Sequence, residues 1–441
     1  MNTNATIPAT FPVEFIERTI CLAEEAYRPQ IGGVVTFDGK LNDARLARAV
    51  RLLLDAEPVL GCRFVADGAP PVWQRLGNLD SMSILDVREC EDQEGAAAAF
   101  IAEPLDFTTG PQLLVALLRG PSSDALAVKV THVVMDGGAL KETLYLIGEF
   151  YRSLLERPEW TPEPNLDGVR HPMAKAGVIE KLGSFRQSDM TLRPSDWKMT
   201  VLDDRGREAY LTSTVEPDVF RSALGLGKSV GATANDVILT AYYRTLWLLL
   251  GAAPGARTPI MNSCELRKHL PAGTKTALSN ISSAWYVSVP SPAEVETFDQ
   301  TLDRVVAATG EWKRNGAGRN SAIGIPIVDR LMRKKDMESM RKLLFGKDTE
   351  VGQQVAGLTN IGVIDDSKLT FGPSACVTDA WLLGPVSHVA LILTTTTYRD
   401  RLHLALGAEL AALDKELAEG VVTGTANEIE SWVAARGMQV A

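Results

Sequence analysis

The sequence has few cysteines and few histidines, five of each in 441 residues. The cysteines are scattered along the chain, and none forms a C-x-x-C pair with another: Cys21, Cys62, Cys90, Cys264 and Cys376. This spacing fits neither a structural zinc site nor a disulfide framework. An odd number of cysteines is typical of a reducing compartment, so we expect a cytoplasmic protein.

Long apolar runs are missing as well. The longest, LWLLLGAAP near residue 250, is far shorter than the roughly 20 residues that a helix needs to cross a bilayer. The N-terminus lacks the basic region and the apolar core of a signal peptide. We therefore expect no membrane span.

Positive charge is in deficit, because 45 lysines and arginines face 55 aspartates and glutamates, a net charge of −10. An acidic surface repels phosphate backbones, which argues against nucleic-acid binding. Six basic residues nevertheless cluster in one stretch: Arg330, Arg333, Lys334, Lys335, Arg341 and Lys342. They indicate either the solvated face of a helix or a docking patch for an anionic partner or cofactor phosphate.

Hydrophobic residues make up 45% of the chain, enough for a large core, and the pattern alternates strands with helices. Expected strands are 31–39, 61–68, 71–76, 81–87, 112–120, 124–134, 207–216, 258–264, 282–289, 357–365, 389–398 and 401–409. Expected helices are 41–60, 91–106, 138–155, one from Pro217, one from Thr233, 296–314, 322–345 and 413–435. Four prolines within 157–172 indicate a connection between halves. The fold class is therefore α+β with two lobes, 1–165 and 166–441, and a ligand site is expected in the cleft between them.

Two common catalytic motifs are only imitated. Gly227, Lys228 and Ser229 resemble the end of a phosphate-binding loop, but Ser222 stands where that loop needs its first glycine, and the preceding residues have a helical pattern. The segment GPSAC at 372–376 lacks the second glycine of a serine-hydrolase elbow. Neither nucleotide binding nor serine-hydrolase chemistry is supported.

One stretch combines residues suited to acid–base chemistry: VTHVVMDGGAL, residues 130–140. An apolar run that predicts a buried strand ends at His132, and Asp136 follows four residues later with Gly137 and Gly138 behind it. A histidine at a strand end is held by the sheet, and a neutral imidazole near pH 7 is a common general base. The two glycines permit close approach of another group, and Asp136 is suited to fix the loop through a salt bridge. Because no third ligand lies nearby in sequence, a metal site is not expected.

THVVMDG resembles the HHxxxDG signature of the condensation-domain and acyl-CoA-dependent acyltransferase superfamily, which includes polyketide-associated acyltransferases, alcohol acetyltransferases and wax-ester synthases. Further segments resemble the same family in the same order: VVTFDGKLNDARLARAVRLLLDAEPVLGCRF, GATANDVILTAYYRTL, MNSCELRKHL, LSNISSAWYVSV and LTNIGVI. The resemblance covers nearly the whole chain. It implies two chloramphenicol-acetyltransferase-like lobes arranged in a V, with a tunnel between them that has the motif at its middle.

The resemblance also implies roles for individual residues. His132 matches the catalytic second histidine of the signature, Asp136 its structural aspartate and Gly137 its glycine. Thr131 replaces the first histidine, a position that is mainly architectural in the family, so the support of the loop is expected to differ. As the arginine partner of Asp136 we favour Arg267 over Arg63. The D-F-G-W-G sequence of the plant branch is absent, and LTFGPS resembles it only slightly.

The implied activity is acyl transfer from a coenzyme A thioester to a hydroxyl or amine of a small molecule, with His132 as general base and no permanently bound cofactor. One alternative is a free-standing condensation enzyme whose donor is a phosphopantetheine thioester on an acyl or peptidyl carrier protein. Another is a non-catalytic or repurposed protein, such as a binding protein or a cyclase, on the same scaffold. The sequence does not identify the group that stabilises the oxyanion.

Overall fold

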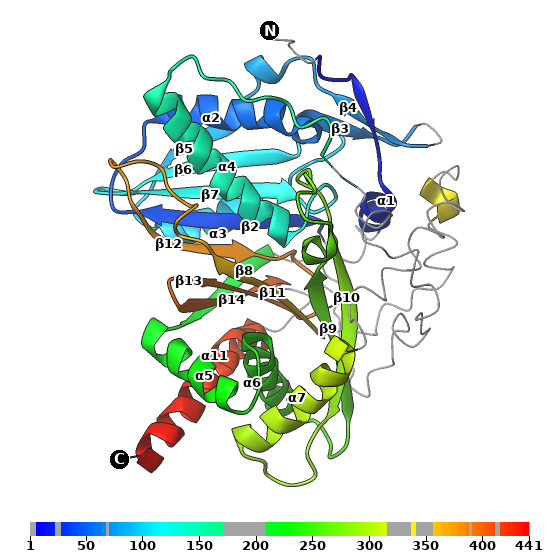
Figure 1. Cartoon of the computed structure of the whole chain (residues 1–441), viewed down its shortest axis with the longest axis vertical. Coiled ribbons are helices and arrows are strands. Elements are labelled where there is room, and N and C mark those ends of the chain that lie inside the picture. Colours follow the sequence, from blue (N-terminus) through cyan, green and yellow to red (C-terminus); the bar gives the residue numbers. More distant parts are fainter. Residues whose placement is uncertain are drawn as a thin grey trace.

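The computed structural model describes residues 6–22, 28–67, 70–168, 170, 208–314, 337–340, 356–387, 390–410 and 415–440. Their strands form three sheets of five, six and three strands, with helices packed on the two larger ones (Figure 1). The predicted α+β class is therefore confirmed. The cluster of basic residues between 330 and 342 lies outside the described residues, as does nearly all of the helix expected over 322–345.

The first lobe is built on the five-stranded sheet, whose strand order is β12-β2-β7-β6-β5. Its strands are β2 (Gln30–Phe37), β5 (Leu85–Glu89), β6 (Leu113–Arg119), β7 (Asp124–Thr131) and β12 (Val377–Leu383). Only the pairing of β5 with β6 is parallel. Its helices are α2 (Asp43–Ala56), α3 (Gln93–Ala102) and α4 (Gly137–Glu156).

Strand β7 is the central strand that leads to the motif, and all eight of its residues are buried. Leu126 and Val128 share the core of α2 and α4, whereas Ala125 and Ala127 share the core of α3. Alternate side chains of a strand point to opposite faces, so the helices cover both faces of this sheet (Figure 1). Burial on both faces explains why the segment has a continuous apolar run, as expected for a buried strand.

The second lobe is built on the six-stranded sheet, in the order β10-β9-β11-β13-β14-β8. Its strands are β8 (Glu208–Val215), β9 (Arg257–Glu265), β10 (Ser282–Pro290), β11 (Ala356–Ile364), β13 (Ile392–Tyr398) and β14 (Arg401–Glu409). Its helices are α5 (Pro217–Ser229), α6 (Ala234–Leu249), α7 (Phe298–Arg314) and α11 (Lys415–Val440). The predicted capping box is confirmed at α6: Thr233 Oγ1 accepts from the N–H of Asp236, whose carboxylate accepts from the N–H of Thr233.

The hairpin predicted over 61–76 is confirmed, because β3 (Cys62–Val65) pairs antiparallel with β4 (Val72–Arg75). Strand β1 (Thr10–Pro12), which we did not predict, adds a third strand to this small sheet. Helix α1 (Phe15–Leu22) follows it and was also not predicted. None of the helices in the described part of the chain is long and apolar enough to cross a membrane.

Strand β12 joins the two halves of the chain. It comes from the second half, yet it pairs antiparallel with β2 and forms one edge of the first sheet, with Val35 opposite Ala380. We did not predict this strand. Residues 157–168 contain no helix or strand, in agreement with the expected connection. The lobe limits 1–165 and 166–441 stay a prediction, and β12 is a segment that crosses them.

Candidate active site

His132 lies directly after the last residue of β7, at the start of the turn into α4. Its backbone N–H donates to Pro29 O at 2.7 Å, which ties the turn to the segment that leads into β2. From the second half of the chain, Asn280 Nδ2 donates to His132 O at 3.0 Å and to Val133 O at 2.8 Å. Both halves of the chain therefore fix the backbone of this residue.

The orientation of the imidazole is set by one hydrogen bond. His132 Nδ1 lies 2.8 Å from Met135 O. A carbonyl oxygen only accepts, so Nδ1 carries the hydrogen, and in the neutral ring the basic lone pair is on Nε2. Burial lowers the pKa of His132 below its ordinary value, although the contacts with Met135 and Asp136 oppose this. The ring is therefore neutral at pH 7, in the tautomer that a general base requires.

Asp136 fixes the start of α4. It is the N-cap residue of that helix, and its Oδ1 accepts from the N–H of Ala139 at 2.9 Å. Its Oδ2 accepts from the N–H of Ile281 at 2.6 Å, and Arg267 Nη2 lies 3.0 Å from Oδ1. The carboxylate thus has partners on the helix, on the segment that leads into β10 of the other lobe, and on an arginine. These contacts all lie within the protein and fix the carboxylate in the loop.

Of the two arginines considered as partner of Asp136, Arg267 is the one that contacts it. Arg267 Nη2 also donates to Ser279 O at 2.7 Å. Burial works against the charged guanidinium, but Asp136 and Glu265 raise the pKa of Arg267 above its ordinary value. Arg63 instead donates to Gln74 Oε1 at 2.9 and 2.7 Å on the surface.

The two glycines after Asp136 provide space for side chains of the second lobe. A Cβ on Gly137 would lie 2.7 Å from Ile361 Cδ1. A Cβ on Gly138 would lie 2.8 Å from Arg267 Nη1 and closer still to Glu265. A real Cβ atom essentially never comes this close to another heavy atom, so a larger residue at either position would force Ile361, or Glu265 and Arg267, to shift.

Thr131 stands where the resemblance places the first histidine, and its side chain supports the turn. Its hydroxyl donates to Pro29 O at 3.2 Å and accepts from the N–H of Val133 at 3.3 Å. The residue is buried. The hydroxyl therefore supplies two polar contacts within the turn that presents His132.

We expect Thr131→Val to lower the free energy of unfolding by about 1–2 kcal/mol, because valine leaves the buried N–H of Val133 without this acceptor. Urea unfolding measures the change. The matched control is Thr378→Val in β12, where the hydroxyl is exposed and contacts Thr36; its cost is expected to stay within about 0.5 kcal/mol. Equal costs at both positions would contradict the supporting role of Thr131.

A cavity of about 280 Å³ lies beside His132. Helix α1, the β7–α4 turn, strands β9, β10 and β11, and the segment before β10 all contribute to its wall. The lining residues are Ile16, Ile20, His132, Asp136, Gly137, Gly138, Met261, Ser263, Cys264, Glu265, Asn280, Ser282, Ser283, Ala284, Thr359, Asn360 and Ile361. Three of the residues singled out from the sequence, His132, Asp136 and Gly137, thus meet at one cavity, with Arg267 behind its wall.

Sequence reasoning assigned no role to Asn280 and Glu265, which lie in segments that resemble the superfamily. Asn280 holds the backbone of the turn, and Glu265 lines the cavity beside Arg267, with Arg267 Nη1 2.9 Å from Glu265 Oε2. No local pattern marks either residue, because each meets the motif only through packing of the lobes. The residues that imitate a phosphate-binding loop, Gly227, Lys228 and Ser229, form the last turn of α5 instead.

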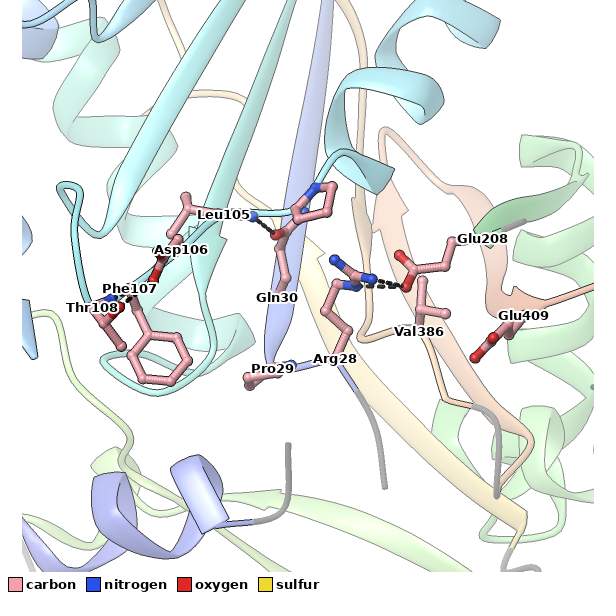
Figure 2. A pocket seen from close by; sticks show the side chains of 11 residues that line it. Arg28, Pro29, Gln30, Leu105, Asp106, Phe107, Thr108, Glu208, Val386 and Glu409 are labelled. Atoms are coloured by element: carbon pink, nitrogen blue, oxygen red, sulfur yellow. Dashed lines mark hydrogen bonds and ion pairs between the residues drawn. The ribbon is translucent and has the colours of Figure 1, made fainter. Parts of the chain in front are cut away.

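A second cavity of about 280 Å³ lies beyond Pro29, whose carbonyl oxygen binds the N–H of His132. Figure 2 shows Arg28 extended toward Glu208 and Gln30 contacting the backbone of Leu105. The N–H of Arg28 also donates to Val386 O at 2.9 Å, so this cavity is bordered by both halves of the chain. Pro29 thus lines this cavity and is hydrogen-bonded to a residue that lines the other one, His132.

No family model matches the sequence. Among curated proteins, the chain is 25% identical to gramicidin S synthase 2 of Brevibacillus brevis over 247 residues, 53% of this chain. It is 23% identical to a plipastatin synthase protein of Bacillus subtilis (strain 168) over 258 residues, 55% of this chain. The chain spans only 5% and 10% of the length of these two relatives.

Solved structures match nearly the whole chain. The first condensation domain of the calcium-dependent antibiotic synthetase superposes with a TM-score of 0.67 at 15% identity, covering 98% of this chain and 97% of that one. Trichothecene 15-O-acetyltransferase from Fusarium sporotrichioides superposes with a TM-score of 0.68 at 10% identity, covering 96% of this chain and 95% of that one. The starter condensation domain of rhizomide synthetase, in complex with C8-CoA and Leu-SNAC, superposes with a TM-score of 0.59 at 15% identity, covering 97% of this chain and 95% of that one. The chain therefore has the fold of condensation domains and related acyltransferases, which confirms the resemblance that the motif indicated.

Proposed function

We propose that this chain is an acyltransferase that moves an acyl group from a coenzyme A thioester to a hydroxyl or amine of a small-molecule acceptor, with His132 as general base. The observation that carries the proposal is the fixed orientation and neutral form of the His132 imidazole beside a cavity. Its Nδ1 is held by Met135 O, burial lowers its pKa, and the residue lines a cavity. A fixed, neutral imidazole with its basic nitrogen on the other side of the ring is suited to accept a proton from an acceptor.

The proposed reaction has two steps. As the acceptor oxygen or nitrogen attacks the thioester carbonyl, its proton passes to His132 Nε2. When the tetrahedral intermediate collapses, the carbon–sulfur bond breaks and the imidazolium returns the proton to the departing thiolate. No covalent enzyme intermediate is needed, since both substrates meet beside one base and their proximity supplies much of the rate.

The choice of coenzyme A as donor draws support from two structural neighbours, one named as an acetyltransferase and one solved in complex with C8-CoA. The curated relatives are peptide synthases, which keeps a carrier-protein thioester as the second candidate donor. Because one fold hosts several reactions, the donor must be decided by experiment.

The test is a thiol-release assay with purified protein, a panel of acyl-coenzyme A thioesters, and pooled alcohols and amines. We expect release that depends on the acceptor, with the acylated product found by mass spectrometry. A parallel arm offers the same acyl groups on phosphopantetheinyl carrier protein. Transfer from the carrier alone would overturn coenzyme A as the donor, and no product in either arm would overturn acyl transfer.

The lowered pKa of His132 also predicts the pH dependence. A general base acts in its neutral form, so activity is lost as pH falls through the pKa of His132. Since burial lowers this pKa from its ordinary value of 6.5, we expect the acidic limb of log kcat/KM to have its midpoint below pH 6.5 and activity to be level near pH 7. A midpoint at or above 6.5 would argue against His132 as the titrating base.

A further inference from the structure

We propose that the cavity beside His132 selects acceptors that carry an ammonium group, and that Glu265 is the residue that recognises this group. This inference rests on the proposed function, because it names the class of acceptor for that reaction. The expected acceptors are amino alcohols and diamines. Their nucleophilic end lies at His132, and their second, cationic end lies at Glu265.

The charges in the cavity wall favour a cation. Among the described residues that line the cavity, Asp136 and Glu265 are the acidic ones, and none of the described lining residues is a lysine or an arginine. Arg267 neutralises them from behind the wall, with Nη2 3.0 Å from Asp136 Oδ1 and Nη1 2.9 Å from Glu265 Oε2. Two carboxylates in this wall therefore share one guanidinium.

Glu265 is the carboxylate that a ligand can reach. The side chain of Asp136 is only 5% exposed and its oxygens are bonded to the N–H groups of Ala139 and Ile281. The oxygens of Glu265 accept hydrogen bonds from Arg267, but its side chain is 42% exposed. Desolvation by the wall, together with the charge of Asp136, raises the pKa of Glu265 above its ordinary value. A group in this state gains from a further positive partner.

Lys141 is not the further positive partner of Glu265 in the cavity. It interacts electrostatically with Glu265, but its ammonium donates to Ile361 O at 3.3 Å and to Val363 O at 3.1 Å. It is not among the residues that line the cavity. The ammonium of Lys141 therefore binds backbone carbonyls of β11, while Glu265 lines the cavity.

The remaining lining residues suit a short chain with two polar ends. Hydroxyl and amide side chains lie on the β9, β10 and β11 side: Ser263, Ser282, Ser283, Thr359 and Asn360. Apolar side chains for the methylene groups between the two ends are Ile16, Ile20, Met261 and Ile361. A cavity of about 280 Å³ holds an acceptor of a few carbon atoms.

The test compares 5-aminopentan-1-ol with hexan-1-ol, which differ by an ammonium in place of a methyl group. Dissociation constants are measured by ligand-detected NMR, without any acyl donor. We expect the wild-type protein to bind the amino alcohol about tenfold more tightly, as a hydrogen bond between charged groups provides. Glu265→Gln should abolish this preference, and Glu265→Asp should retain part of it.

Glu142→Gln is the matched control, since it removes one carboxylate from an exposed position of α4 outside the cavity; it should keep the preference. Equal binding of the two probes by wild type, or a preference that persists in folded Glu265→Gln, would overturn the inference. Binding is also measured in His132→Ala, where the preference should persist. A protein that prefers the amino alcohol but transfers no acyl group would therefore refute the proposed function and leave the binding preference of the cavity standing.

Discussion

We expect the replacement of His132 by alanine to lower kcat for acyl transfer by roughly 10²–10⁴-fold, the usual contribution of a positioned general base. We expect the loss to fall on kcat, because in the proposed reaction the imidazole takes the proton only as the acceptor attacks. Binding of the acceptor, measured separately, should change far less. Thiol release under saturating donor and acceptor measures the effect.

The control for this prediction is His269→Ala. His269 lies in a short 3-10 helix, Arg267–His269, and does not line the cavity. We expect this variant to retain wild-type kcat, and circular dichroism to show that both variants are folded. A loss below tenfold in His132→Ala would exclude the general-base role, whatever the activity of the protein proves to be.

Replacing Arg267 by alanine lowers the free energy of unfolding by about 3 kcal/mol, because it leaves the buried carboxylate of Asp136 without its cation. Asp136 keeps its bonds from the N–H groups of Ala139 and Ile281, so we place the cost at the low end for a broken buried pair. Urea unfolding gives the value, and activity should fall as well, since the same pair fixes the turn that carries His132.

Arg63→Ala is the matched control, because Arg63 lies on strand β3 and contacts Gln74 on the surface. Its cost should stay within about 0.5 kcal/mol. The double variant Asp136→Asn/Arg267→Ala should be less destabilised than the sum of the two single changes, since position 136 then no longer carries a buried, unpaired carboxylate. Equal costs for the two arginine variants would show that the Asp136–Arg267 pair does not stabilise the fold.

The features that the sequence predicted correctly are those set by neighbouring residues. Burial of β7 on both faces produces a continuous apolar run, and the capping box at Thr233 and Asp236 spans three residues. The spacing of His132 and Asp136 places one at the strand end and the other at the N-cap of α4. Each pattern is local, so it can be recognised without knowing the partner elements.

Strand β12 is the main element that the sequence pattern did not predict. Its pairing with β2 is irregular between Val377 and Asp379, so its residues do not alternate cleanly. Its stability as a strand comes from β2, more than 300 residues earlier in the chain. A strand that depends on a distant partner carries little signal of its own.

The sequence by itself thus determined the α+β class, the order of most elements and the placement of His132 and Asp136 around one turn. Only the tertiary structure decided which residues complete the site. Arg267 meets Asp136 across 131 positions, and Asn280 meets His132 across 148. Glu265 reaches the cavity from β9 in the same way. Contacts of this range depend on how two sheets pack against each other, and that packing is the sum of many weak interactions that no short motif records.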